Sequence, residues 1–272
     1  ELGPGVITLD TQETPHLAFG LDPDEDFSKE LFYATRESGS WQLTNVDPDD
    51  YSVGPSNYFV SDISIAVDES RRVHIGYTNL TESHADEVRY AYSTTDGWER
   101  EIVESDPDSA AFSSCSIAVD QNGNPHLAYL GPGNLTGTGR YLYPHATRST
   151  RLEGADATVC LSTDLAGQNE APTVAYNTLD TADLVVSSDG YYWVEHVLDG
   201  DYGPLSVDIG TDGNGDYHVA YHAYQDANTQ AMKYAYRLGA FDESVSVEIE
   251  QVGTDGNVYP IYASIAVDGA GS

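Results

Sequence analysis

The side chains best suited to chemistry in this sequence are histidines that recur at a fixed distance from an aspartate. In four places a histidine stands six residues after an aspartate and opens a short apolar run. An imidazole beside a carboxylate is a pair used in acid–base catalysis. A catalytic residue is needed only once, so four copies favour a structural role, in which the histidine bonds the turn or the preceding aspartate. The pairs are Asp10 with His16, Asp68 with His74, Asp120 with His126, and Asp212 with His218.

An acidic loop is a candidate cation site. Asp22, Asp24 and Asp26 stand at alternate positions, and Glu30 follows as a closing ligand. Calcium prefers clustered oxygens of this kind. The spacing resembles the D-x-D-x-D loops of integrin-type propellers, although Phe27 stands where the sharp turn usually needs glycine. The sequence requires no cofactor, calcium is its one cofactor hypothesis, and a solvated acidic loop explains the same residues.

Signatures of other active sites are missing from the sequence. It has no G-x-S-x-G motif, and its arginines are scattered singly except for Arg71 and Arg72, so we expect no arginine cluster for a sialic acid carboxylate. With 45 Asp and Glu residues, carboxylate pairs arise by chance and decide nothing about glycosidase chemistry. We therefore predict no catalytic residue and regard an enzyme as the less favoured class.

Two sequons and two cysteines complete the candidate sites. Asn79 and Asn134 each begin an Asn-Leu-Thr sequon, which predicts glycans on one rim of an extracellular protein. Cys115 and Cys160 permit either one disulfide or two small buried thiols, and they do not decide the compartment.

One pattern repeats along the chain. Each copy opens with a short strand that ends in aspartate, and successive aspartates lie 58, 52, 44, 48 and 56 residues apart. The copies are Val6-Ile-Thr-Leu-Asp10, Ser64-Ile-Ala-Val-Asp68, Ser116-Ile-Ala-Val-Asp120, Cys160-Leu-Ser-Thr-Asp164, Asp208-Ile-Gly-Thr-Asp212 and Ser264-Ile-Ala-Val-Asp268.

Three more strands follow in each of the first five copies. The second strand begins at the histidine, or at Thr173 in the fourth copy, the third usually contains Tyr-Ala, and the fourth is marked by Trp41, Trp98 or Trp193. Four short β-rich segments separated by turn residues predict a meandering antiparallel sheet, the blade of a β-propeller. A small residue two places before each aspartate, such as Ala66, predicts that the first strand is the innermost.

We therefore predict an all-β fold, a β-propeller of four-stranded antiparallel blades with five complete repeats visible and the first strand of a sixth. The expected repeats occupy residues 5–60, 61–112, 113–156, 157–205 and 206–260, with a partial repeat to 272, in a single domain over 1–272. A closed five-bladed ring and an excerpt of a longer propeller both fit this pattern.

The repeat resembles a known family. The form S-[IL]-A-[VL]-D-x-x-G-x-x-H-[ILV]-[AS]-Y, followed by a Tyr-Ala strand and a Gly-x-Trp hairpin, is similar to repeats of secreted bacterial and archaeal propeller proteins. The match is best from Ser64 to Val103 and from Ser116 to Tyr129. The resemblance implies the fold, but it implies little about function because such propellers carry many activities.

The charge balance narrows the setting and the partners. The net charge is -34, yet 40% of residues are hydrophobic, which is too many for a disordered acidic chain. Molar salt shortens the Debye length to about 3 Å and removes most of the self-repulsion, so we infer a haloarchaeal protein or one from a virus of such cells. The charge argues against nucleic acid and anionic membranes as partners. No apolar run is long enough to span a bilayer.

The functional prediction follows from the missing catalytic signature. We expect an extracellular binding or assembly module of a halophilic cell surface, filament or virion. Its blade loops would recognise glycans or a surface protein, copies of itself included. The alternatives are a secreted enzyme acting on an extracellular polysaccharide and a purely structural spacer domain.

Overall fold

The chain folds into β-strands joined by turns and loops. The computed structural model contains no helix among the residues that it describes, and so no helix there that could cross a membrane. This confirms the all-β prediction. The described residues are 2–22, 30–37, 39–48, 58–81, 86–106, 113–120, 122–131, 138–142, 150–151, 155–163, 172–178, 184–189, 193–199, 204–212, 217–226, 229–237, 248–255, 265 and 267.

The chain divides into two units. The first consists of residues 1–134 and 143–147, and the second of residues 135–142 and 148–272. The expectation of one domain over 1–272 stays a prediction, as does the number of blades.

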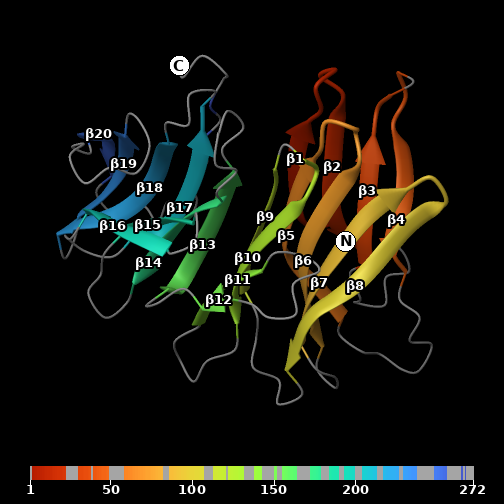
Figure 1. Cartoon of the computed structure of the whole chain (residues 1–272), viewed down its shortest axis with the longest axis horizontal. Coiled ribbons are helices and arrows are strands. Elements are labelled where there is room, and N and C mark those ends of the chain that lie inside the picture. Colours follow the sequence, from red (N-terminus) through yellow and green to blue (C-terminus); the bar gives the residue numbers. More distant parts are fainter. Residues whose placement is uncertain are drawn as a thin grey trace. The chain divides into compact units, whose positions relative to one another are not determined.

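The first unit contains two complete four-stranded sheets and two strands of the third repeat (Figure 1, red to yellow-green). The first sheet consists of β1 (Leu2–Leu9), β2 (Pro15–Leu21), β3 (Glu30–Thr35) and β4 (Gln42–Asp47). The second sheet consists of β5 (Tyr58–Val67), β6 (Val73–Thr81), β7 (Asp86–Thr94) and β8 (Gly97–Asp106). The third repeat adds β9 (Ser113–Val119) and β10 (Pro125–Gly131).

The second unit contains the rest of the third repeat and two further sheets. The third repeat supplies β11 (Thr138–Leu142) and β12 (Thr150–Arg151). The fourth sheet consists of β13 (Ala155–Thr163), β14 (Pro172–Thr178), β15 (Leu184–Asp189) and β16 (Trp193–Asp199). The fifth sheet consists of β17 (Pro204–Thr211), β18 (Tyr217–Asp226), β19 (Thr229–Arg237) and β20 (Glu248–Asp255).

The strands of the first, second, fourth and fifth sheets follow the order of the chain. Each strand pairs antiparallel with the next one. This is the meander that the sequence pattern predicts, because short strands joined by turn residues pair with their neighbours in sequence. Such a sheet is the unit from which propeller blades are built.

The first strand of every repeat contains a bulge near its beginning. The register between the first and second strands shifts there in all five repeats. In β5 and β9 the shift falls at Asp62 and Ser114, whose φ angles are 36° and 51°. Bulges bend a strand and increase its twist.

The first two sheets pack face to face through an apolar core. Leu31 and Tyr33 of the first sheet share a buried cluster with Ile75 of the second, and Trp98 of β8 packs against it. The rings of Trp98 and Tyr33 meet edge to face, with centroids 5.1 Å apart. Burial of apolar surface contributes about 25 cal/mol per Å², so this contact is a main source of cohesion in the unit.

Small residues allow consecutive repeats to approach closely. A Cβ added to Gly76 of β6 would lie 2.4 Å from Leu127 Cδ1 and 3.0 Å from Cys115 Sγ of the next repeat. In the second unit, a Cβ on Gly210 of β17 would lie 2.7 Å from Val267 Cγ2, which places Val267 against the fifth sheet.

One hydrogen bond joins consecutive repeats at equivalent sequence positions in both units. Ser64 Oγ accepts from the Ile117 backbone N–H at 3.1 Å. Asp208 Oδ2 accepts from the Ile265 backbone N–H at 2.8 Å. An oxygen side chain in the first strand of one repeat therefore binds the backbone of the next.

A Gly76→Ala variant tests this close packing. We expect it to lose about 1–3 kcal/mol of unfolding free energy, because the new methyl group displaces Leu127 and Cys115 from a filled interface. Urea unfolding in molar KCl measures the loss. Unfolding free energy equal to that of the parent protein would contradict the prediction.

Candidate functional site

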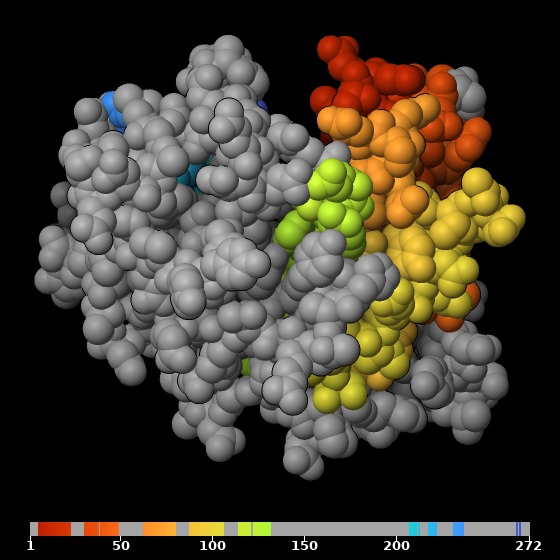
Figure 2. Space-filling view, in the orientation of Figure 1, coloured from red at the N-terminus to blue at the C-terminus, as the bar shows by residue number. Residues whose placement is uncertain are grey.

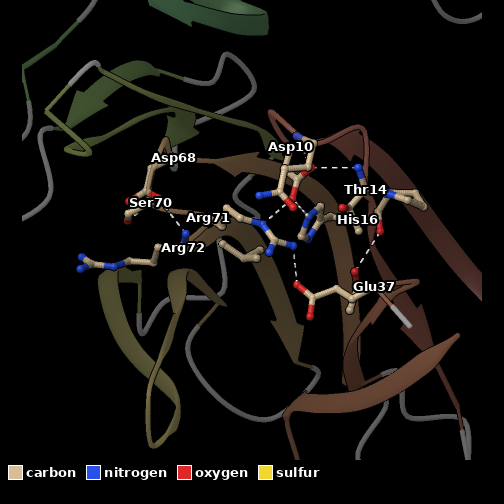
Figure 3. Close-up of polar contacts among 12 residues, drawn as sticks. Asp10, Thr14, His16, Glu37, Asp68, Ser70, Arg71 and Arg72 are labelled. Atoms are coloured by element: carbon tan, nitrogen blue, oxygen red, sulfur yellow. Dashed lines mark hydrogen bonds and ion pairs between the residues drawn. The ribbon is translucent and has the colours of Figure 1, made fainter. Parts of the chain in front are cut away.

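The repeat aspartates hold the turn between the first and second strands. Asp10 Oδ1 accepts from the backbone N–H groups of Gln12 and Thr14, both at 2.8 Å (Figure 3). Its own backbone N–H donates to Thr14 O at 3.1 Å. A short acidic side chain that accepts from N–H groups two and four residues ahead fixes a tight turn.

The same turn recurs in the next two repeats. Asp68 Oδ1 accepts from the Arg72 N–H at 2.7 Å, and Asp120 Oδ1 accepts from the Asn124 N–H at 2.8 Å. These aspartates are buried, as is Asp212 of the fifth repeat. Their carboxylates therefore contact other groups of the protein and not the solvent. Asp164 of the fourth repeat lies outside the described residues.

The histidines of the first, second and fifth repeats reach a tyrosine of the third strand. His16 Nδ1 lies 2.6 Å from the Tyr33 hydroxyl, and His74 Nδ1 lies 2.7 Å from that of Tyr90. In the fifth repeat His218 Nδ1 lies 2.5 Å from the Tyr234 hydroxyl. The sequence showed both residue types in the repeat but gave no sign that they bond across two strands.

In the first three repeats, Nε2 of the histidine faces the repeat aspartate. Nε2 lies 3.4 Å from the carboxylate in the first repeat and 3.5 Å from it in the second and third. A carboxylate only accepts, so this geometry favours the Nε2–H tautomer and leaves Nδ1 to accept from the tyrosine. The Asp–His–Tyr set, defined by Asp10, His16 and Tyr33 and their equivalents, links three strands of one sheet.

Burial fixes the charge states of this set. It lowers the pKa of His74, and it raises the pKa of Tyr33 and of Tyr90, so both hydroxyls keep their protons. Burial alone would raise the pKa of Asp68, but hydrogen bonds from Ser70 and the Arg72 N–H outweigh it and hold that pKa below its ordinary value. In the second repeat the set is therefore a neutral imidazole between an ionised carboxylate and a phenol.

The turns of the second and third repeats also touch the aspartate of the repeat before them. Arg71 Nε donates to Asp10 Oδ2 at 2.7 Å, and Arg71 Nη2 donates to Glu37 at 2.5 Å (Figure 3). In the third repeat the equivalent Gly123 lies against the Asp68 carboxylate, within 3.1 Å of an added Cβ. One carboxylate therefore stabilises its own turn and also contacts the turn of the next repeat.

Arg71 makes this contact from an unusual backbone conformation. Its φ is 66°, and the equivalent Glu13 and Gly123 have φ values of 61° and 78°. Glycine adopts this left-handed region without the steric cost that other residues meet. A residue other than glycine is strained at this φ angle. The ion pairs of Arg71 with Asp10 and Glu37 explain why arginine stands at this position.

A second set of polar contacts joins the outer parts of consecutive sheets. Tyr77 donates to Asp47 at 2.6 Å, and Asp47 also accepts from Arg89 and Arg100 at 2.5 and 3.0 Å. In the next repeat Tyr129 donates in the same way to Glu104, at 2.7 Å. Sequence reasoning missed the role of these carboxylates, although an acid near the end of the fourth strand in the first two repeats was a usable signal.

This geometry is more typical of a structural hydrogen-bond network than of a reaction centre. In the described part of the chain, no group of three or more His, Cys, Asp or Glu side chains is arranged to hold a metal ion. The Asp–His–Tyr sets are buried and repeated, and the arginines at positions 71, 89 and 100 are paired with acids. The same contacts in several repeats stabilise turns and sheet contacts.

The structure describes only the ends of the acidic loop proposed for calcium. Asp22 is buried directly after β2. Glu30 lies in β3 opposite Leu21 and accepts from Asn45 Nδ2 at 2.5 Å. Asp24 and Asp26 lie outside the described residues, so the calcium site stays a prediction.

The structure argues against glycosylation at one of the two sequons. Asn79 lies within β6, where it pairs with Val60 and Glu87, and it is only 2% exposed. A buried strand amide does not fit a glycosylation acceptor, which belongs in a surface loop. Asn134 lies outside the described residues. Cys115 is a free, fully buried thiol whose pKa is raised by burial, which agrees with the buried-thiol alternative for this residue.

Comparisons with known proteins identify the fold. No protein-family model matches the chain, and no curated protein matches its sequence. A mutant NanB sialidase from Streptococcus pneumoniae has a TM-score of 0.57 at 9% identity, over 96% of this chain and 62% of that one. The Hadza microbial sialidase Hz136 has a TM-score of 0.55 at 10% identity, over 94% of this chain and 59% of that one. The polysaccharide lyase Uly1 has a TM-score of 0.55 at 10% identity, over 84% of this chain and 56% of that one.

These likenesses define a class. With the observed meandering sheets, they identify an all-β, β-propeller-like protein. The chain spans less than two thirds of the length of each of these three proteins. At such identities the similarity concerns the fold alone.

Glycine substitutions at two equivalent turn positions separate backbone strain from ion pairing. Glu13→Gly should stabilise the protein by roughly 1 kcal/mol, because it relieves the left-handed conformation and Glu13 is exposed. Arg71→Gly relieves the same strain but removes the cation from Asp10 and Glu37, so we expect lower stability. Urea midpoints of both variants check this, and shifts in the same direction would contradict it.

The buried histidine predicts a loss of stability in weak acid. Because the pKa of His74 is lowered in the folded state, the unfolded chain binds the proton more readily below its ordinary pKa of about 6.5. Stability should therefore fall as the pH drops from 6.5 to the folded pKa. The lowered pKa of Asp68 and of Asp120 adds a further loss below pH about 4.

Unfolding free energies measured from pH 8 to pH 4 check this dependence. A His74→Gln variant keeps a polar side chain but cannot titrate in this range. It should show a shallower slope below pH 6.5 than the parent protein. An unchanged slope would assign the acid sensitivity to other groups.

Proposed function

We propose that this protein is a binding module that recognises neutral glycans or a protein neighbour through the loops of its repeats. The carrying observation is that the recurring Asp, His and Tyr residues are bound to one another inside the sheets. Side chains used in this way are unavailable to a substrate. Recognition then falls to the segments in which the repeats differ from one another.

The charge of the chain selects the partner. A net charge of -34 repels nucleic acids, anionic membranes and acidic polymers. Arg71, Arg89 and Arg100, which could have bound a carboxylate of the ligand, already pair with carboxylates of the protein. Neutral glycans avoid this repulsion, which is why we place them before acidic ones.

The similar structures support a glycan partner. Two are named as sialidases and one as a polysaccharide lyase, so proteins of this fold class act on glycans. We extend only the glycan class to this chain. A propeller-like scaffold keeps its sheets while its loops change, so a relation in ligand class does not require a shared reaction.

We further propose an extracellular setting at a halophilic cell surface, filament or virion. The support is compositional, because a surface this acidic is best tolerated where salt screens its self-repulsion. Calcium bound through Asp22 and Glu30, with the two aspartates between them, is part of the same proposal.

The second candidate function is an enzyme acting on an extracellular polysaccharide. The observation that favours it is the likeness to the lyase Uly1 over 84% of this chain. Such a site would need one set of carboxylates and aromatics that differs from the other repeats.

A glycan array probed in molar KCl tests the proposed function. The labelled chain should bind neutral oligosaccharides, and its preference for them over sialylated or uronic acid glycans of the same length should grow as the KCl concentration is lowered, because less salt screens the repulsion less. A His74→Gln variant that stays folded serves as the control, because it alters the frame inside the sheets and should keep the same glycan profile.

Incubation of the chain with the bound polysaccharides separates the two candidates. Unchanged polymer length supports the binding module. Shortened polymer would favour the enzyme, and the absence of any glycan binding would overturn the glycan proposal in favour of a protein partner or a spacer.

A further inference from the structure

Three tyrosine hydroxyl groups each lie beside the Nδ1 atom of a repeat histidine. The pairs are Tyr33 with His16 at 2.6 Å, Tyr90 with His74 at 2.7 Å, and Tyr234 with His218 at 2.5 Å. In the first two pairs Nε2 faces an aspartate, so Nδ1 accepts from the phenol O–H. Burial raises the pKa of Tyr33 and of Tyr90, so each proton stays on its oxygen at neutral pH. The phenolic proton is thus aligned with a base inside the protein.

The base differs in kind from the acceptor that two other buried tyrosines use. Tyr77 donates to Asp47, and Tyr129 donates to Glu104. An imidazole, with an ordinary pKa of about 6.5, is a stronger base than a carboxylate, whose ordinary pKa is about 4. Asp47 is also paired with Arg89, which favours its ionised form. A phenol that is bonded to an imidazole therefore transfers its proton more readily than one bonded to these carboxylates.

A buried carboxylate lies on the far side of two of these imidazoles. Asp10 Oδ2 is 3.4 Å from His16 Nε2, and Asp68 Oδ2 is 3.5 Å from His74 Nε2. Ordinary N–H···O bonds are shorter, at about 2.7–3.2 Å, and neither Nε2 atom has a hydrogen-bond partner among the described residues. A proton added at Nδ1 would turn this long contact into an ion pair in a medium of low dielectric constant. The carboxylate therefore stabilises a positive charge on the imidazole.

A second aromatic ring, which is only half-buried, contacts each of the three tyrosines. The contacts join Tyr33 to Trp98, Tyr90 to Tyr92, and Tyr234 to Tyr236, with ring centroids 5.1, 5.2 and 5.6 Å apart. The hairpin of β7 and β8, which carries Trp98 and Tyr92, reaches the surface in Figure 2, where it is drawn in yellow. Indole and phenol rings are among the side chains that lose one electron most readily. Each contact is therefore a route by which an electron can leave the inner phenol.

The fourth repeat forms its sheet without this arrangement. Thr173 stands at the position of the histidine. The pairing of β14 with β15 places Val186 at the position that Tyr90 has in the second sheet, and Ser188 at that of Tyr92. The four strands of the fourth sheet nevertheless pair in the same order. Histidine, phenol and neighbouring ring are lost together, which is expected of residues that act as one unit.

We propose that Tyr33, Tyr90 and Tyr234 are redox-active tyrosines, each of which donates one electron to a one-electron oxidant while its phenolic proton moves to the bonded histidine. The phenol O–H bond breaks and an N–H bond forms at Nδ1. The products are a neutral tyrosyl radical, an imidazolium and the oxidant reduced by one electron. When ascorbate returns an electron, the proton moves back to the phenol oxygen. Electron transfer needs no contact between oxidant and phenol, so a buried Asp–His–Tyr set can act in this way.

Photo-oxidation of the full chain tests the proposal. A flash generates tris(bipyridine)ruthenium(III) in the presence of a sacrificial electron acceptor, and transient absorption records the yield and lifetime of the tyrosyl radical. A variant with Tyr33→Phe, Tyr90→Phe and Tyr234→Phe keeps the rings and removes the three hydroxyl groups. We expect its yield of long-lived radical to fall several-fold. The matched control, with Tyr77→Phe and Tyr129→Phe, loses hydroxyl groups bonded to carboxylates and should keep the yield of the parent protein.

Replacement of the bases tests where the proton goes. A variant with His16→Gln, His74→Gln and His218→Gln keeps all tyrosines but offers amides, which are far weaker bases. Its radical yield should also fall several-fold. In the parent protein, high-field EPR should show the g-value shift of a tyrosyl oxygen that accepts a hydrogen bond from a charged donor, and the histidine variant should lose this shift.

Equal radical yields in the parent protein and the triple phenylalanine variant would overturn the proposal, as would an equal loss in the control. A full yield with an unchanged EPR spectrum in the histidine variant would overturn the role of the imidazole. Urea unfolding shows whether each variant is folded. Where a triple variant does not fold, the single substitutions Tyr90→Phe and His74→Gln take its place, and each should lower the yield. None of these outcomes depends on glycan binding.

Discussion

The buried carboxylate that follows the first strand in the first, second, third and fifth repeats is the interaction on which the described structure depends. Asp10 accepts from the backbone of its own turn, faces the imidazole of His16 and receives Arg71 from the next repeat. A buried charge is tolerated only when such partners surround it. The position of one side chain therefore fixes a turn, a hairpin and the approach of the following sheet.

This constraint explains why the conspicuous residues are poor markers of function. A set that stabilises turns must recur in the repeats, and it turns the Asp, His and Tyr side chains toward one another inside the sheets. Function can then reside where the repeats diverge. The first and second sheets diverge in this way. The first sheet has the cross-strand pair Phe19 and Phe32 where the second sheet has Tyr77 and Arg89.

Much of the fold could be predicted because its signals are local. The spacing from Asp68 to His74 indicates a turn between two strands, and both residues stand where the pattern placed them. The bond from His74 to Tyr90 could not be predicted, since it depends on the register of β6 and β7. The sequon at Asn79 was misjudged for a related reason, because β6 extends two residues beyond it and buries its amide.

The sequence by itself determined the strand order, the repeat and the acidic character, because alternation, turn residues and composition are properties of neighbouring positions. Only the tertiary structure decided which oxygen meets which donor, as in the pairing of Arg71 with Asp10 across 61 positions of the chain. It also decided that Ile7 and Leu9 are exposed while the equivalent Ile117 and Val119 are buried. The physical reason is that burial depends on what lies opposite a side chain, and the pattern around that side chain does not contain this information.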